Sequence, residues 1–207
     1  MITRTLPGSA RSALLLAGLA VGGLVLVGCS APQAGSAATL GDTRISETAL
    51  TQEVQAVLAA KQQPVDSGTP ELMDKTLGRL ITADLVNTLA VKNGIVVTQG
   101  DIDEQLSTYD DQVGGRDQVI QVFAEQDVAP TQIEGIVRMN LQAQQLGIKL
   151  DPHGSADTQG QAVFDAVAQL SDQLGVQSSP RYGEWQVQTL AVVPGLDELS
   201  VPPAQAQ

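Results

Sequence analysis

The chain has 207 residues, with 23 acidic and 11 basic side chains and a formal net charge of −12. Such acidity argues against nucleic acid as a partner, because phosphates need Lys and Arg, and against electrostatic binding to an anionic membrane. With a single cysteine the chain forms no internal disulfide. Stability must therefore come from packing, although the sequence has only one Trp, two Tyr and two Phe.

The first 28 residues differ from the rest of the chain. Arg4 and Arg11 precede an uncharged stretch at residues 13–28, ALLLAGLAVGGLVLVG. A membrane-spanning helix needs about 20 apolar residues, so this stretch is short for a span, but it suits the apolar region of a signal peptide. We therefore predict a signal peptide over residues 1–28, and a plain transmembrane anchor is the alternative.

The end of this apolar stretch, Leu26-Val27-Gly28-Cys29, resembles the lipobox of bacterial lipoproteins. The resemblance implies that a diacylglycerol is attached to the sulfur of Cys29 and that the chain is cut between Gly28 and Cys29. Residues 29–37, CSAPQAGSA, then form a flexible tether. A lipid anchor of this kind would hold the protein at the cell membrane, facing the extracytoplasmic side.

Residues 38–62 predict a strand-turn segment followed by a helix. The sequence ATLGDTRIS reads as a short strand, a turn at Gly41-Asp42 and a return to Ile45. Ser46 is a suitable N-cap, and apolar residues follow it at helical spacing, so a helix is expected over residues 46–62.

The strongest helical pattern begins at Thr69-Pro70 and ends at Asn93-Gly94. Thr69 can cap this helix, Pro70 suits its first turn, and the Asn-Gly pair is typical of a helix C-terminus. Its apolar face is broad enough to meet two neighbours, which places the helix at the centre of the core.

Four further helices follow, separated by Gly and Pro residues. We expect them from Thr98 to about Tyr109 and over residues 116–126, 131–146 and 158–174. Two of them begin with a predicted capping box, Thr98 with Asp101 and Thr131 with Glu134. The stretch Ile95-Val96-Val97 is too short to assign as a strand, and residues 149–157 read as a hinge-like loop.

The C-terminal part changes character. Trp185, Val187 and Thr189 alternate with polar residues, which predicts a strand over residues 184–189. Residues 191–207 are expected to form a disordered tail.

The order of these segments resembles the N-terminal chaperone domain of foldases of the SurA type, in a bacterial lipoprotein form. The resemblance rests on Gly41–Leu50, Gly94–Leu106 and Pro180–Trp185 and covers roughly residues 38–190. It implies a mostly α, multi-helix domain in which the first strand pairs with a strand from the C-terminal end, which we assign to residues 184–189. The C-terminal motif of this family corresponds to Pro180, Arg181, Tyr182, Gly183 and Trp185.

Two of these motif residues are aromatic. We expect Tyr182 and Trp185 to cover the helical core, and a role in stacking on a ligand is the alternative.

One departure from the family concerns catalysis. Many such foldases carry a parvulin domain, which isomerises prolyl bonds. Here only residues 147–157 separate two predicted helices, and they hold the sole histidine, His153. The resemblance therefore implies chaperone character without the enzyme.

No other chemistry is predicted: no catalytic residue, no cofactor other than the covalent lipid on Cys29, and no metal site. One histidine and one lipidated cysteine cannot build a catalytic triad. Residues 101–111, DIDEQLSTYDD, are acidic but lack the glycine and the final glutamate of a calcium loop. They are predicted to be a solvated helix face.

These observations favour a membrane-anchored holdase that binds unfolded or newly exported polypeptides, with no nucleic acid and no small-molecule substrate. Clients would bind by apolar burial in a groove beside the long helix, and the candidate residues are Leu77, Leu80, Ile81 and Leu85. The alternative is an accessory or structural envelope lipoprotein that docks one specific partner. A peptidyl-prolyl isomerase is the least favoured hypothesis.

Overall fold

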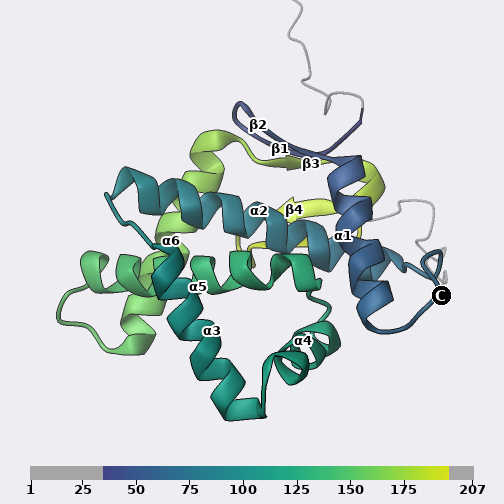
Figure 1. Ribbon diagram of the computed structural model, residues 1–207. Coiled ribbons are helices and arrows are strands. Elements are labelled where there is room, and N and C mark those ends of the chain that lie inside the picture. Colours follow the sequence, from purple (N-terminus) through teal and green to yellow (C-terminus); the bar gives the residue numbers. More distant parts are fainter. Residues whose placement is uncertain (1–34, 196–207) are drawn as a thin grey trace, which may run out of the picture. The chain divides into compact units, whose positions relative to one another are not determined.

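The computed structural model describes residues 35–195 (Figure 1). The predicted signal peptide, most of the tether and the lipid-attachment residue Cys29 lie outside the described residues, as do residues 196–207. Six α-helices and five short strands make up the described part, which confirms the predicted mostly helical fold.

A three-stranded sheet joins the two ends of the described chain. β1 (Ser36–Leu40) and β2 (Thr43–Ser46) form the predicted antiparallel hairpin. The predicted tether over residues 29–37 extends too far, because Ser36 and Ala37 are buried in β1. β3 (Gln177–Ser178) pairs with the other edge of β1, also antiparallel, so the strand order is β2-β1-β3. The predicted pairing between an N-terminal and a C-terminal strand is therefore confirmed.

The prediction that residues 184–189 supply the C-terminal strand that pairs with β1 was wrong. β4 (Glu184–Gln186) does not pair with β1 but forms a separate hairpin with β5 (Ala191–Val193). The short helix η2 (Pro180–Tyr182) lies between β3 and β4 and turns the chain back. The predicted tail over residues 191–207 also begins too early, because its first three residues form β5.

The first two helices follow the sequence predictions. α1 (Glu47–Ala60) is capped by Ser46, whose hydroxyl accepts a hydrogen bond from the Ala49 N–H. α2 (Pro70–Lys92) is capped in the same way by Thr69, which accepts from the Leu72 N–H. α2 contacts α1, α5, α6, β1 and β5, so it is the central helix of the fold.

The next two helices form a projection that we call the arm (Figure 1). α3 (Gln99–Val113) begins with both hydrogen bonds of the predicted Thr98–Asp101 capping box and ends at Gly114, which has a left-handed conformation. α4 (Arg116–Glu125) follows directly. α3 runs four residues beyond the predicted end at Tyr109.

The last two helices are longer than predicted. A 3₁₀ turn, η1 (Pro130–Gln132), precedes α5 (Ile133–Leu150), and no side chain caps α5. The predicted Thr131–Glu134 capping box was wrong, because the Thr131 hydroxyl instead donates a hydrogen bond to Glu53 on α1, at 2.9 Å. α6 (Ala156–Leu174) begins after the capping residue Ser155, so the predicted hinge loop shrinks to residues 151–155.

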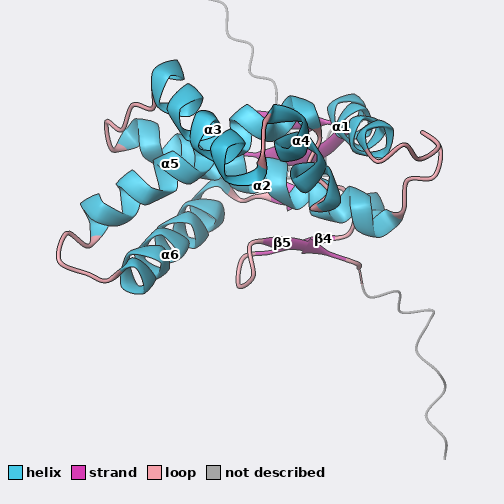
Figure 2. Ribbon diagram, turned by 60° about the horizontal axis from the view of Figure 1, so that its bottom comes forward, coloured by secondary structure: helices cyan, strands magenta, loops and turns pink. Residues whose placement is uncertain are grey.

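Two apolar clusters hold these elements together. The main cluster draws buried residues from β1, β2, α1, α2, α5, α6, η2 and the β4–β5 hairpin. The arm cluster contains six buried residues around α3 and the start of α5, namely Val97, Ile102, Leu106, Val128, Ile133 and Val137. Figure 2 shows the β4–β5 hairpin on the side of α2 opposite to α3 and α4.

Asp127 connects the arm to the rest of the fold. Its carboxylate lies 2.7 Å from Lys61 Nζ and 3.6 Å from Lys75 Nζ, and its backbone carbonyl accepts a hydrogen bond from Arg79 at 2.7 Å. Burial alone would raise the pKa of Asp127, but the hydrogen bond and charge of Lys61, together with Lys75, outweigh this and lower it. The carboxylate thus remains ionised, and it bridges α1, α2 and the segment that follows α4.

Candidate functional site

The four residues predicted to bind clients lie mostly in the core. The side chains of Leu77, Ile81 and Leu85 are fully buried in the main cluster, and Leu80 is half-buried against it. The prediction that they line an open groove is therefore wrong for the three buried residues. The apolar face of α2 is broad because α2 is surrounded by other elements, including β5 of the β4–β5 hairpin, whose position against α2 the sequence does not predict.

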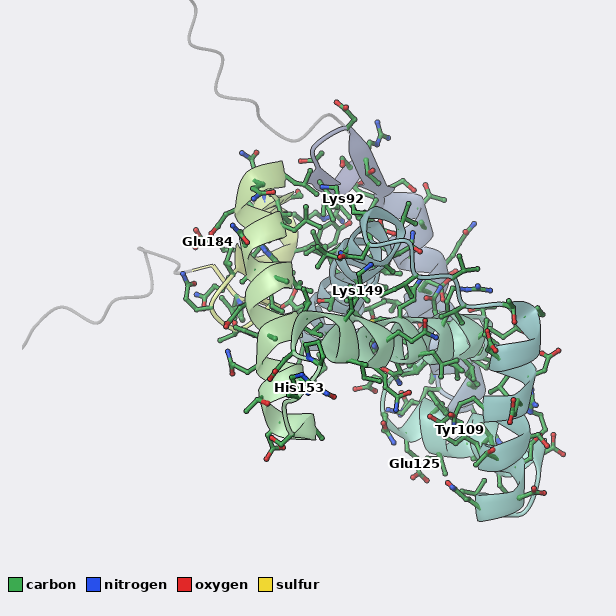
Figure 3. The ribbon with its side chains drawn as sticks, turned by 90° about the vertical axis from the view of Figure 1, so that its left-hand side faces the viewer. Lys92, Tyr109, Glu125, Lys149, His153 and Glu184 are labelled. Atoms are coloured by element: carbon green, nitrogen blue, oxygen red, sulfur yellow. The ribbon has the colours of Figure 1, made fainter. Side chains whose placement is uncertain are left out.

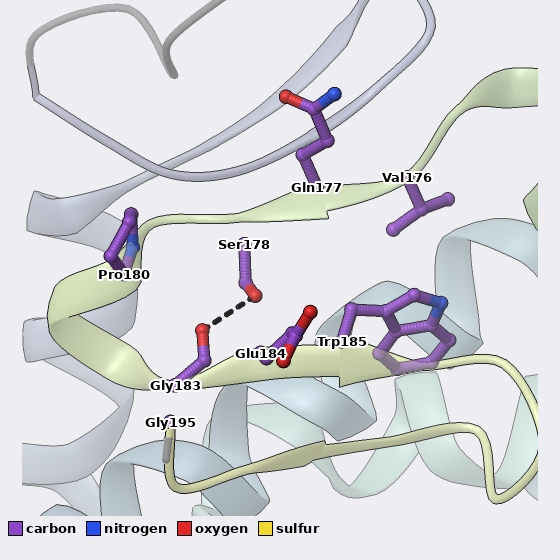
Figure 4. Close-up of a pocket in the computed structure, with 8 residues that line it drawn as sticks. All are labelled: Val176, Gln177, Ser178, Pro180, Gly183, Glu184, Trp185 and Gly195. Carbon is purple, nitrogen blue, oxygen red and sulfur yellow. Dashed lines mark hydrogen bonds between the residues drawn. The ribbon is translucent and has the colours of Figure 1, made fainter. Parts of the chain in front are cut away.

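Open space lies instead beside residues 176–195, which we call the C-terminal segment. A cavity of about 490 Å³ separates β3 from β4 (Figure 4). We call it the C-terminal cleft; its lining residues are Val176, Gln177, Ser178, Pro180, Gly183, Glu184, Trp185 and Gly195. Its volume falls within the range of about 300–1,000 Å³ typical of ligand pockets.

The aromatic residues of the C-terminal motif have a structural position. Tyr182 and Trp185 are both buried in the main cluster, which confirms that they cover the helical core. The indole Nε1 of Trp185 donates a hydrogen bond to the Ser171 hydroxyl on α6, at 2.8 Å. Arg181 lies over the Tyr182 ring, 5.6 Å from its centroid. Trp185 therefore lines the cleft with a side chain whose orientation is fixed.

Gly183 sets the shape of the closed end of the cleft. Its φ of +96° favours glycine, and a Cβ at this position would lie 2.2 Å from the Val193 carbonyl oxygen. Its own carbonyl accepts a hydrogen bond from the Ser178 hydroxyl at 2.8 Å (Figure 4). This bond holds β3 close to β4 at one end, and the two strands flank the cleft beyond it.

Two further cavities, of about 700 and 340 Å³, follow the first half of α2. We call them together the α2 groove; its walls are residues of Thr69–Thr82, Met139, Pro180–Gly183, Leu190–Val192, Pro194 and Gly195. Charges of both signs line it. Burial, and then the charge of Glu71, raise the pKa of Asp74, whereas the hydrogen bond and charge of Glu71 raise the pKa of Lys75.

The α2 groove depends on a close approach between α2 and β5. Gly78 has no side chain, and a Cβ there would lie 3.3 Å from the backbone nitrogen of Val192. A larger residue at this position would push β5 away from α2. The sequence does not predict this contact, because an isolated glycine inside a helical pattern gives no indication of what packs against it.

A smaller cavity of about 280 Å³ lies between α3 and α5 on the arm. No charged residue lines it; its lining consists of Gln105, Tyr109, Val137, Asn140, Leu141 and Gln144. Figure 3 shows Tyr109 and Glu184 at opposite sides of the described structure, so this cavity is separate from the C-terminal cleft. The sequence does not predict this cavity, because its polar lining residues resemble an ordinary solvent-facing helix surface.

Among the described residues we looked for metal-binding groups, for a reactive histidine and for membrane-spanning helices. These residues contain no group of three or more His, Cys, Asp or Glu side chains that could hold a metal ion. His153 is exposed in the short loop between α5 and α6 (Figure 3), and it lines none of the cavities described above. Within residues 35–195, no helix is both long and apolar enough to cross a bilayer.

The sequence of the chain matches one known protein family. A family model described as the SurA-like N-terminal domain matches residues 8–147, which is well over half of the sequence. The chain belongs to the SurA-like N-terminal domain family. No curated protein and no solved structure matches the chain.

The SurA-like match covers α1 to α4 and most of α5, and it stops before α6. The C-terminal motif at Pro180–Trp185 and the C-terminal cleft therefore lie outside the matched region. Membership of the SurA-like family points to a chaperone-like function outside the cytoplasm and is consistent with polypeptide clients.

Proposed function

We propose that this SurA-like protein is a membrane-anchored lipoprotein that binds unfolded or newly exported polypeptides on the extracytoplasmic side and prevents their aggregation. The observation that carries the proposal is the family match, since it associates the helical domain with chaperone-like function. The lipobox-like Leu26-Val27-Gly28-Cys29 supports the anchor, and the open clefts beside the C-terminal segment offer space for a client.

The proposed mechanism is passive binding without catalysis. An extended client needs apolar contact and partners for its backbone hydrogen bonds. The C-terminal cleft and the α2 groove both have apolar lining residues, such as Val176 and Val192. A parvulin domain is not inserted between α5 and α6, where only residues 151–155 intervene. We therefore propose no prolyl isomerisation, and catalysed isomerisation of a proline-containing peptide by the purified protein would contradict this part.

Aggregation assays test the binding function. The chain from Ser30 onward contains every described residue, and we expect it to suppress the aggregation of several unrelated unfolded proteins at stoichiometric ratios. Val176→Lys should weaken this suppression, because it places a charge beside the C-terminal cleft. The matched control is Val65→Lys, since Val65 is 59% exposed and lines none of the cavities described above. Absence of suppression for every client would refute the proposal.

The anchor is tested separately with Cys29→Ser. Without the thiol there is no site for the lipid, so the uncleaved precursor should accumulate and the processed, lipid-anchored form should be lost. Cell fractionation and metabolic labelling with a fatty acid measure both. A variant that is cleaved and anchored like the parent chain would show that the lipoprotein proposal is wrong.

A further inference from the structure

The C-terminal cleft is bordered by a strand edge. β3 pairs with β1 through Ala38 opposite Ser178 and Thr39 opposite Gln177. The next residue, Ser179, donates its N–H to the Ala37 carbonyl at 2.8 Å. Backbone groups in an antiparallel ladder alternate between the two sides of a strand. The N–H and C=O of Ser178 therefore point away from β1, and Ser178 is one of the residues that line the cleft.

β4 does not occupy this edge. Among residues 35–195, no backbone hydrogen bond joins β3 to β4, and the hydrogen bond between them comes from the Ser178 side chain to the Gly183 carbonyl. β4 takes β5 as its partner instead. The cleft thus lies between β3 of one small sheet and β4 of the other, as Figure 4 shows.

The walls of the cleft indicate which ligand would fit. Val176 and Trp185 provide apolar surface, and Glu184 is the one charged residue among the lining residues. Glu184 is exposed, and Figure 3 shows it at the surface. A free strand edge offers donors and acceptors that match a polypeptide backbone, and a carboxylate at its side favours a basic side chain over an acidic one.

We propose that the edge of β3 binds an extended, apolar polypeptide segment that carries a Lys or Arg residue, by addition of that segment as a further strand of the β2-β1-β3 sheet. The segment pairs with the N–H and C=O of Ser178, because the Val176 N–H is already donated to the Ser171 carbonyl at 3.2 Å. Its apolar side chains contact Val176 and Trp185, and its basic residue lies near Glu184. This inference rests on the proposed polypeptide-binding function and assigns that function to one edge.

Backbone methylation of a peptide distinguishes strand addition from binding through side chains alone. The probe is a fluorescently labelled heptapeptide of alternating Val and Thr with one central Lys, and its binding to the chain from Ser30 onward is measured by anisotropy. One derivative carries N-methyl groups on its Val residues and another on its Thr residues. Only every second backbone N–H of a paired peptide faces β3. One derivative should therefore lose about tenfold in affinity, while the other binds like the parent peptide.

Charge and contact variants refine the test. Exchanging the central Lys for Glu should weaken binding about two- to fivefold, the range for an exposed ion pair, and Glu184→Gln should remove this difference. Val176→Thr should weaken binding, whereas Val65→Thr should not.

An equal loss of affinity for both methylated derivatives, or no loss of affinity for either, would overturn strand addition. Suppression of client aggregation by a protein that does not bind the peptide would overturn it as well, and would leave the chaperone function in place. If the chain neither binds the peptide nor suppresses aggregation, the proposed function itself is refuted.

Discussion

The main cluster and the arm cluster are both well buried, but they are assembled from very different stretches of chain. Every member of the arm cluster, buried or partly buried, lies between Ile95 and Leu141. The main cluster instead spans Ala37 to Val192 and brings both ends of the described chain together. The arm is therefore built from contacts that are local in sequence, and the main cluster from contacts that need the whole fold. This difference predicts that the two regions respond differently to mutation.

The largest expected effect is in the centre of the main cluster. Ile81→Ala removes a fully buried side chain of α2 and should lower the free energy of unfolding by about 2–5 kcal/mol. Ile102→Ala is the matched change in the arm, because Ile102 is equally buried. It should increase amide hydrogen exchange in α3 and α4 while α2 stays protected, since small local units can open on their own.

Denaturant unfolding and residue-resolved hydrogen exchange measure the two variants. An equal increase of exchange in α2 and α3 for both variants would show that the clusters unfold as one unit, and the comparison would then fail.

A smaller effect is expected where the two regions are joined. Asp127→Asn removes the ion pair with Lys61 and should cost about 1.5–3 kcal/mol at pH 7. Asp127 has a φ of 62°, and Asn tolerates that conformation. The pKa of Asp127 is lowered from its ordinary value of 3.8. The contribution of the Asp127 carboxylate to the free energy of unfolding is therefore complete above its unfolded-state pKa, and it is lost as the pH falls through its folded-state pKa.

The difference in stability between the parent chain and Asp127→Asn should accordingly be constant near neutral pH and shrink below about pH 4. Asp111→Asn, at an exposed position on α3, serves as the control and should change stability by less than about 0.5 kcal/mol. A stability difference for Asp127→Asn that does not depend on pH would contradict the assigned role of the carboxylate.

The smallest effect is expected at the helix caps. Thr98→Ala removes the capping box of α3 and should cost about 1 kcal/mol. Exchange of the first-turn amides of α3 should increase most. Thr131→Ala should cost less than about 0.5 kcal/mol, because Thr131 caps no helix and makes one exposed hydrogen bond. A larger cost for Thr131→Ala than for Thr98→Ala would reverse this ranking.

The sequence predicted the local features of the fold well. Ser46, Thr69 and Thr98 cap the helices for which they were predicted, and a glycine ends α3. These features are predictable because a cap involves residues only three apart in the chain. The capping box at Thr131 failed for a long-range reason: its hydroxyl bonds to Glu53 on another helix.

The candidate site was predicted less well. The apolar face of α2 was identified, but Leu77, Ile81 and Leu85 turned out to be covered, partly by a hairpin whose strands lie about 110 residues later in the chain. The alternation at residues 184–189 indicated a strand correctly but not its partner, because a period of two is the same for any partner.

The sequence by itself determined the positions of the helices, the acidic character of the chain and the lipobox-like segment, since each depends on neighbouring residues. Only the tertiary structure decided that β3, and not β4, closes the sheet with β1. It also decided that the open surface lies around the C-terminal residues, in the cleft between β3 and β4 and along the first half of α2, and not at Leu77, Ile81 and Leu85. These outcomes depend on contacts between distant segments, such as Gly78 with Val192 and Trp185 with Ser171, whose free energies are set by packing in three dimensions.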